Sequence, residues 1–144
     1  MSNQGKYTFG KEEHLCKRML IEKLFAGQAK SMTAWPIRMV YLLVDNQEKH
    51  DELKAQRASV QVLMSVSKRY FKRAVKRNRV KRQLREAYRC QKQALEEQMA
   101  CLEGKRLLVA FVWQENRLWD TSKIDAKVGT LLDRLVEKLN DEVS

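Results

Sequence analysis

The residues best suited to chemistry in this chain are cationic and lie close together in the sequence. Between Ser65 and Arg89 there are eleven lysine and arginine residues and one acid, Glu86. An arginine side chain offers a planar fork of donors that meets phosphate oxygens in pairs. Asn78, between two arginines, adds a neutral donor and acceptor. These residue types favour binding to a phosphate polymer.

The positive charge is concentrated and not dispersed. The 144 residues have a net charge of +11, from 29 basic and 18 acidic side chains, yet Asn116–Ser144 has five basic and six acidic residues. This uneven distribution of charge is typical of a nucleic-acid-binding surface. Charges that serve only solubility are spread more evenly over the chain. A solvated charged face and a membrane-surface helix stay open as alternatives.

Other side chains give little support for catalysis by the protein itself. The three cysteines are scattered without a Cys-x-x-Cys pair, and the two histidines stand alone. A protein nuclease with its own metal would need clustered carboxylates, but the acids lie mainly at predicted helix starts and in a loop. We therefore predict no catalytic residue and no metal ligand in the protein.

Hydrophobic periodicity predicts three helices and three strands around the basic segment. Polar stretches indicate a loose arm over Met1–Gly10 and a surface loop over Asp45–Arg57. Ser122 and Asp125 form a capping-box pattern where the last helix begins. The predicted elements are a helix over Glu12–Phe25, strands over Ile37–Val44 and Ser59–Ser67, a helix over Ala74–Leu102, a strand over Arg106–Trp113 and a helix from Ser122 to Leu139.

The basic residues from Arg77 onward fall on one of these helices. At about 100° per residue, its apolar residues share one arc, so this face can dock on a sheet while the cations face outward. The arc consists of Val80, Leu84, Ala87 and Tyr88. The order of elements predicts a single domain over residues 1–144 with an α+β two-layer sandwich. The chain lacks a secretory signal and an apolar run of about 20 residues, so we expect a cytoplasmic protein without membrane contact.

One segment also carries a family resemblance. The sequence SVSKRYFKRAVKRNRVKRQLREAYR, from Ser65 to Arg89, closely resembles the protein subunit of bacterial ribonuclease P. In that family a Ser-Val-Ser-Lys strand end precedes an Arg-Asn-Arg helix. The stretches EHLCKRMLIEKLF and WPIRMVYLL resemble the Bacteroidetes-type members, and the likeness extends roughly from Phe9 to Leu139.

The resemblance implies a fold and an activity. The fold is an α-β-β-β-α-β-α sandwich with a small mixed sheet and a left-handed β-α-β crossover, as in some ribosomal proteins. The activity is endonucleolytic removal of the 5′ leader from precursor tRNA, by a holoenzyme whose RNA subunit holds most of the Mg²⁺. The protein is then a non-catalytic subunit that binds the catalytic RNA and the leader, with no organic cofactor and no obligate protein partner.

The charge cluster and the resemblance together predict the site residues. The RNA-binding residues are Lys68, Arg69, Lys76, Arg77, Asn78, Arg79, Lys81, Arg82, Arg85 and Arg89. The resemblance implies a leader-binding cleft between the first helix and the sheet, lined by Ile21, Phe25, Tyr41, Val62 and Met64. Ile21 stands where many members have Phe. A structural RNA-binding protein that uses the same helix on double-stranded RNA stays an alternative, and an effect of leader length on precursor affinity would separate the two.

Overall fold

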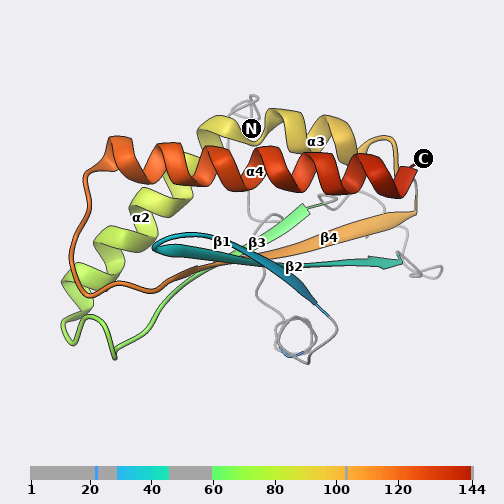
Figure 1. Ribbon diagram of the computed structural model, residues 1–144. Helices are drawn as coiled ribbons and strands as arrows, with labels where there is room; N and C mark the ends of the chain where they lie inside the picture. The colour runs from blue at the N-terminus through green and yellow to red at the C-terminus, as the bar shows by residue number, and fades with distance from the viewer. Residues whose placement is uncertain (1–21, 23–28, 46–59, 103, 144) are drawn as a thin grey trace, which may run out of the picture.

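A computed structural model describes residues 22, 29–45, 60–102 and 104–143 of the chain. The predicted arm over Met1–Gly10, most of the helix over Glu12–Phe25 and the loop that follows Asp45 lie outside the described residues. Glu22 is helical, in agreement with the first predicted helix. The following description covers the remaining elements (Figure 1).

The described chain forms one four-stranded sheet and three helices. Strand β2 pairs antiparallel with β1 and β4, whereas β3 pairs parallel with β4, and the order across the sheet is β1-β2-β4-β3. The elements are β1 (Lys30–Ala34), β2 (Ile37–Asp45), β3 (Val60–Val66), α2 (Ala74–Gln91), α3 (Gln93–Met99), β4 (Lys105–Trp113) and α4 (Thr121–Val143). The predicted α+β fold with a small mixed sheet is confirmed. The hand of the β3-to-β4 crossover stays a prediction.

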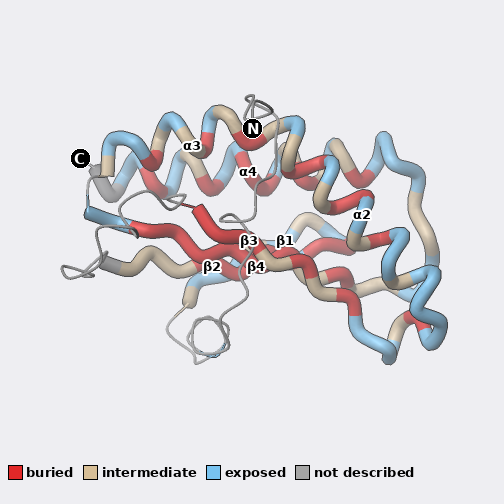
Figure 2. The backbone as a smooth tube through the Cα atoms, turned by 180° about the vertical axis from the view of Figure 1, so that it is seen from behind, coloured by how far each residue is buried: buried red, intermediate tan, exposed pale blue. Residues whose placement is uncertain are grey.

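The three helices cover one face of the sheet (Figures 1 and 2). Alternate strand residues, such as Met39, Val62 and Phe111, point into the core that the helices close. Leu84 of α2 and Leu131 of α4 are fully buried against them. Burial of these apolar side chains fixes how α2 lies on the sheet, and therefore which of its sides faces solvent.

Strand β4 is buried on both faces, which explains its uninterrupted apolar sequence. Leu107 and Phe111 belong to the core beneath the helices, whereas Leu108 and Ala110 form a second cluster with Val40 on the other face. A strand buried on both sides needs no polar alternation. The strand predicted over Arg106–Trp113 is confirmed.

Two predictions about elements were wrong. The helix predicted over Ala74–Leu102 is two helices, α2 and α3, with Lys92 between them. The break was invisible in the sequence because the apolar period continues across it, with Leu95 and Met99 buried like the apolar arc of α2. The periodicity also missed β1, a short edge strand with an irregular burial pattern. The resemblance did imply three consecutive strands before the basic helix, and that order is confirmed.

Helix α4 begins at Thr121, one residue before the predicted start at Ser122 and two before the start that a Ser122 cap would give. The carbonyl oxygen of Asp120 accepts hydrogen bonds from the backbone N–H groups of Lys123 and Ile124, each at 3.1 Å. Ser122 therefore lies inside the first turn and not at the cap, so the predicted Ser122–Asp125 box was wrong. Although α4 is 23 residues long, none of the described helices has the length and apolarity needed to cross a membrane.

Candidate nucleic-acid interface

The basic segment starts at a tight turn that follows β3. The backbone N–H groups of Tyr70 and Phe71 donate to the carbonyl oxygen of Ser67 at 3.1 and 3.4 Å, and the N–H of Arg69 donates to Ser67 Oγ at 3.0 Å. The Phe71 side chain is only 5% exposed and anchors the turn in the core. The turn therefore holds Lys68 and Arg69 at the end of the sheet.

Helix α2 is anchored by its predicted apolar arc. Val80, Leu84, Ala87 and Tyr88 are each at most 1% exposed, which confirms this prediction. Gln83 shares the arc, and its Nε2 donates to the Trp119 carbonyl at 3.2 Å and to Thr121 Oγ1 at 3.0 Å. Sequence reasoning did not anticipate this tie between α2 and the start of α4. With that side fixed, the opposite side of α2 is free to bind a partner.

Eight of the ten predicted RNA-binding residues lie on α2, and Lys68 and Arg69 lie in the turn before it. Figure 2 shows that the backbone of α2 alternates between buried and exposed positions. Arg77, Lys81, Arg85 and Arg89 are half-buried at the flanks of the helix. The remaining six are exposed, and together they are called the basic surface below: Lys68, Arg69, Lys76, Asn78, Arg79 and Arg82. The structure thus places the whole predicted set in one continuous stretch, in the turn after β3 and along α2 (Figure 1).

Carboxylates neutralise little of this charge. Glu86, the single acid of the segment, pairs with Arg89, whose Nη2 lies 2.8 Å from Glu86 Oε1. The hydrogen bond from Arg89 holds the pKa of Glu86 below its usual value, so Glu86 is ionised at neutral pH. Among residues 29–45, 60–102 and 104–143, no other cation of the predicted set pairs with a carboxylate. The uncompensated like charges favour a polyanionic partner.

Arg77 has a structural task in addition to its predicted one. Its Nη1 donates to the carbonyl oxygens of Phe71 and Lys72, both at 2.8 Å. These two bonds tie the first turn of α2 to the linker that precedes it. Contact between Arg77 and RNA stays a prediction, but part of its guanidinium is already engaged by the protein.

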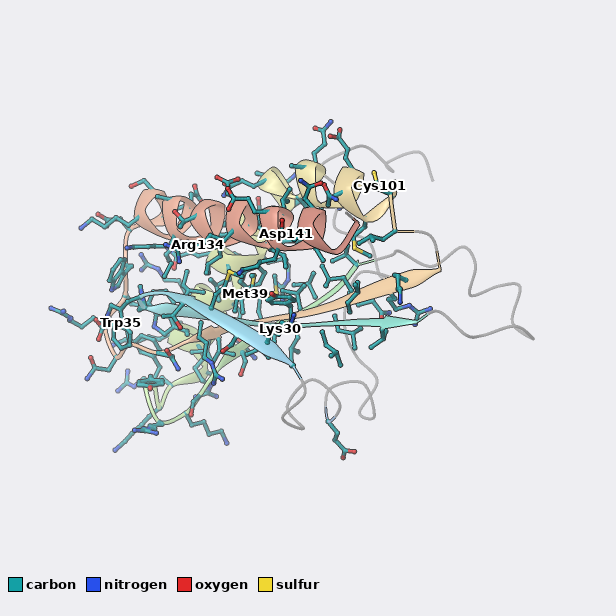
Figure 3. All side chains as sticks on the ribbon, turned by 45° about the vertical axis from the view of Figure 1, so that its right-hand side comes forward. Lys30, Trp35, Met39, Cys101, Arg134 and Asp141 are labelled. Atoms are coloured by element: carbon teal, nitrogen blue, oxygen red, sulfur yellow. The ribbon has the colours of Figure 1, made fainter. Side chains whose placement is uncertain are left out.

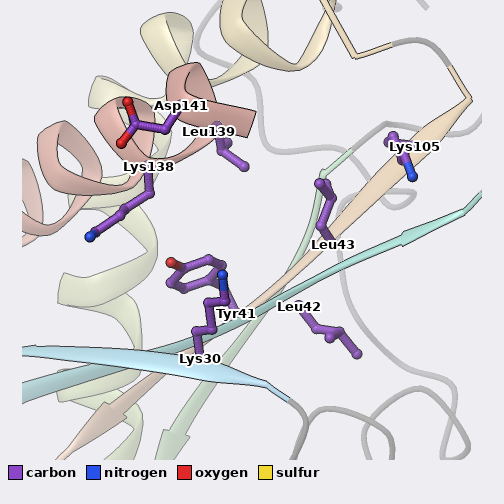
Figure 4. Close-up of a pocket in the computed structure, with 8 residues that line it drawn as sticks. All are labelled: Lys30, Tyr41, Leu42, Leu43, Lys105, Lys138, Leu139 and Asp141. Carbon is purple, nitrogen blue, oxygen red and sulfur yellow. The ribbon is translucent and has the colours of Figure 1, made fainter. Parts of the chain in front are cut away.

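The predicted leader cleft is only partly described. Ile21 and Phe25 lie outside the described residues. Tyr41 lines a hollow of about 470 Å³ where β1 and β2 meet the last turns of α4 (Figure 4). Three lysines from separate elements also line this hollow, and sequence reasoning missed them: Lys30, Lys105 and Lys138.

Val62 and Met64 were wrongly assigned to the cleft. They are 1% and 7% exposed and belong to the core between the sheet and the helices. The physical reason is strand alternation: both share a face with Val60 and Val66, and that face is the one covered by α2 and α4. These two side chains stabilise the fold and are not available to a ligand. Tyr41 lies on the same face, because Tyr41 and Val62 both pair with Val109, and it is only 7% exposed in the same core cluster. It is therefore packed like Met64 and forms only part of the wall of the hollow beside α4.

Comparisons with known proteins agree on one family. The family model described as Ribonuclease P matches residues 9–136. The chain is 40% identical over 137 residues to the ribonuclease P protein component of Porphyromonas gingivalis, covering 94% of this chain and 91% of that protein. It is 41% identical over 95 residues to the protein of the same name from Chlorobium phaeobacteroides, covering 66% and 61%.

Two solved structures share the fold at low sequence identity. The ribonuclease P protein from Thermotoga maritima aligns with a TM-score of 0.60 and 19% identity, covering 85% of this chain and 96% of that one. The ribonuclease P protein of Staphylococcus aureus aligns with a TM-score of 0.56 and 18% identity, covering 85% and 94%. These two likenesses support the α+β architecture.

Proposed function

Because the chain belongs to the ribonuclease P protein family, we propose that it binds RNA through the basic surface on α2 and the preceding turn. Membership makes the chain the protein component of the ribonuclease P ribonucleoprotein, an endoribonuclease of tRNA 5′ processing. It therefore associates with the RNA subunit of that enzyme. The proposal concerns which residues make the contact and what the contact achieves.

One observation carries the proposal: the cations of the basic surface face solvent without carboxylate partners among the described residues, in the turn after β3 and on a helix whose other side is fixed in the core. When the cations of such a surface neutralise phosphates, the counterions condensed around the RNA are released, and this release drives binding. Because the helix is already anchored, little backbone ordering is needed when RNA binds. Arginine forks and the Asn78 amide then contact phosphate oxygens and ribose hydroxyls.

We further propose that the protein brings together two polyanions, the RNA subunit and the precursor tRNA. A +11 protein between them lowers their mutual repulsion. The single-stranded 5′ leader is then held with little sequence preference, through backbone charge and stacking. Lys30, Lys105 and Lys138, which line the hollow beside Tyr41 with Asp141, are the described residues that support a leader site. The predicted roles of Ile21 and Phe25 concern positions outside the described residues.

The basic surface does not fit a magnesium site of its own. Mg²⁺ takes oxygen ligands, typically carboxylates, whereas these residues offer ammonium and guanidinium groups and one amide. No cluster of three or more histidine, cysteine or acidic side chains that could hold a metal occurs in the described ranges. We therefore assign Mg²⁺ binding mainly to the RNA subunit, and assign positioning and charge screening to the protein.

The first prediction tests the phosphate contacts one arginine at a time. Arg79→Ala and Arg82→Ala each remove one exposed cation from the basic surface. If each guanidinium contacts a phosphate, each change weakens binding to a bacterial ribonuclease P RNA and lowers the slope of log K against log salt by about 1. Binding is measured by filter retention or anisotropy at several salt concentrations.

Lys127→Ala is the matched control for this experiment. It also removes one positive charge, but from α4 and outside the basic surface. Both the affinity and the salt slope of this variant should stay near those of the original protein. An unchanged slope for Arg79→Ala and Arg82→Ala would contradict direct phosphate contact by the basic surface.

A further inference from the structure

An exposed tryptophan lies at the tip of the β1–β2 hairpin. Trp35 is 54% exposed, and only Val75 is also a large exposed hydrophobic side chain in the described part of the chain. Trp35 is the first residue of the two-residue turn between Ala34 and Ile37. Figure 3 places it at the end of the molecule away from Cys101 and Asp141. The fold thus presents a large aromatic surface to solvent.

The backbone of the hairpin that carries Trp35 is fixed by hydrogen bonds to its neighbours, although the indole itself faces solvent. The carbonyl oxygen of Pro36 accepts a hydrogen bond from the N–H of Gln114 at 2.9 Å. Arg134 Nη1, from α4, donates to the carbonyl oxygen of Thr33 at 3.3 Å. Ile37, directly after the turn, is fully buried. A ligand that stacks on Trp35 would therefore meet a platform whose backbone is already in place, so little ordering entropy opposes binding.

The strand register places this platform at the same end of the sheet as the basic surface. Ile37 of β2 and Val66 of β3 are both paired with Trp113 of β4. The turn before Ile37 and the basic linker after Val66 therefore leave the sheet at one end, two strand spacings apart. Two spacings correspond to about 10 Å. An RNA strand that contacts Lys68 can pass over this end and reach Trp35.

The segment between β4 and α4 adds cations to the same end. It starts at Gln114, between the hairpin and the basic linker, because β4 lies between β2 and β3. The Arg117 side chain is 79% exposed and its Nη2 lies 3.5 Å from Glu115 Oε2, whereas Lys123 is exposed as well. Together with Trp119 and Asp120 they line a hollow of about 270 Å³. The cations near Trp35 that favour a polyanion are therefore chiefly Lys68 and Arg69 of the basic linker, and this segment adds Lys123.

We propose that Trp35 stacks on an unpaired base of the RNA that the basic surface holds, so that the interface continues across the end of the sheet to the β1–β2 hairpin. This inference rests on the proposed function. Stacking suits any base because each has a π-face, and the nearby cations hold the backbone. The base comes either from the RNA subunit or from precursor tRNA, and the experiment below separates these two sources.

The test uses Trp35→Ala, Trp35→Phe and the control Thr33→Ala, a change of an exposed side chain on the same hairpin. Two dissociation constants are measured: protein with ribonuclease P RNA, and the assembled holoenzyme with precursor tRNA. Loss of one stacked base should weaken binding roughly 5- to 100-fold, whereas Trp35→Phe should retain most of the affinity. The salt slope should not change, since Trp35→Ala removes no charge.

The outcomes are distinct. Weaker binding of Trp35→Ala to the RNA subunit assigns the base to that RNA, and weaker binding to precursor tRNA alone assigns it to the substrate. Unchanged affinity for both RNAs overturns the inference. If Arg79→Ala weakens binding and Trp35→Ala does not, only the extension to the hairpin fails. If neither variant has an effect, the proposed function fails as well.

A fluorescence measurement keeps the test decisive if Trp35→Ala folds poorly. Trp113 is buried and Trp119 is half-buried, so Trp35 is the indole most open to solvent. RNA should quench the emission of the original protein more strongly than that of Trp35→Phe, because a stacked base contacts the Trp35 indole directly. Equal quenching of the two proteins would exclude stacking on Trp35.

Discussion

The arginines of the Arg-Asn-Arg motif differ in what they do for the folded protein. Arg77 donates two hydrogen bonds to the carbonyls of Phe71 and Lys72, whereas the Arg79 side chain faces solvent without a carboxylate partner among the described residues. The first residue shapes the linker that presents Lys68 and Arg69. The second is available to RNA. Substitutions at the two positions should therefore separate folding from binding.

Arg77→Ala should lower the free energy of unfolding by about 1–3 kcal/mol, because it removes charge-assisted hydrogen bonds to two carbonyls. Arg77→Lys should recover only part of the loss, since an ammonium lacks the guanidinium geometry. Arg79→Ala is the control and should change stability by less than about 0.5 kcal/mol. Urea denaturation followed by circular dichroism measures all three. Equal stability of Arg77→Ala and Arg79→Ala would show that the two carbonyl contacts contribute nothing.

The sequence could predict which residues are cationic but not which of them the protein itself uses. Arg77 and Arg79 point to different sides of α2, but only the turn that brings Phe71 and Lys72 back toward α2 decides that Arg77 finds carbonyl partners. The assignment of Val62 and Met64 failed for a related reason. Alternation showed that they share a face, but which face the helices cover depends on the whole sheet.

Among the elements, α2 and α4 meet at a close contact built on a glycine. Gln91 Nε2 donates to the carbonyl of Ala87 in α2 and to that of Asp125 in α4, at 3.1 and 3.0 Å. A Cβ atom added at Gly129 would lie 2.6 Å from Gln91 Oε1, which is closer than real Cβ contacts come. The glycine therefore leaves room for the side chain that links the two helices.

Gly129→Ala should stabilise the protein only when Gln91 is shortened. In the original protein, the gain in helix propensity of about 1 kcal/mol is offset, because the new methyl group displaces the Gln91 amide from Asp125. In the Gln91→Ala background the same change should raise the free energy of unfolding by about 0.5–1 kcal/mol. Thermal or urea unfolding of the four proteins gives the coupling. Additive effects would mean that Gln91 and Gly129 do not interact.

Periodicity located most described elements because their burial is regular. The apolar arc of α2, the alternation in β3 and the continuous run in β4 each reflect the faces that the fold covers. Periodicity failed to locate elements where the burial of successive residues is irregular or where the backbone breaks. Strand β1 is an exposed edge, and the break at Lys92 interrupts the backbone without interrupting the apolar period.

For the whole molecule, the important property is the uneven distribution of charge. The net charge is +11, but the predicted RNA-binding cations come from one continuous stretch, the turn after β3 and α2. The strand register brings Trp35 to the end of the sheet where that turn begins. The hollow beside Tyr41 is a separate feature, between the sheet and the last turns of α4, and the proposed function assigns it to the single-stranded leader.

The function could be predicted because the motif is specific, and not because the fold dictates it. The stretch from Ser65 to Arg89 carries the family resemblance, and the family model and the relatives confirm it. Strand order, the hairpin tip and the lysines around Tyr41 depend on long-range packing, which local patterns do not encode. Those features required the structure.

The most direct test of the central claim is leader removal by the reconstituted holoenzyme at low Mg²⁺. A bacterial ribonuclease P RNA is combined with the original protein or with the Arg79→Ala/Arg82→Ala double variant, and cleavage of precursor tRNA is measured at low and high Mg²⁺. The double variant should lose most of the stimulation at low Mg²⁺ and recover it at high Mg²⁺, because added cations replace the missing screening of phosphate charge. If the double variant fully stimulated cleavage at low Mg²⁺, this result would contradict the claim that the basic surface binds the RNA.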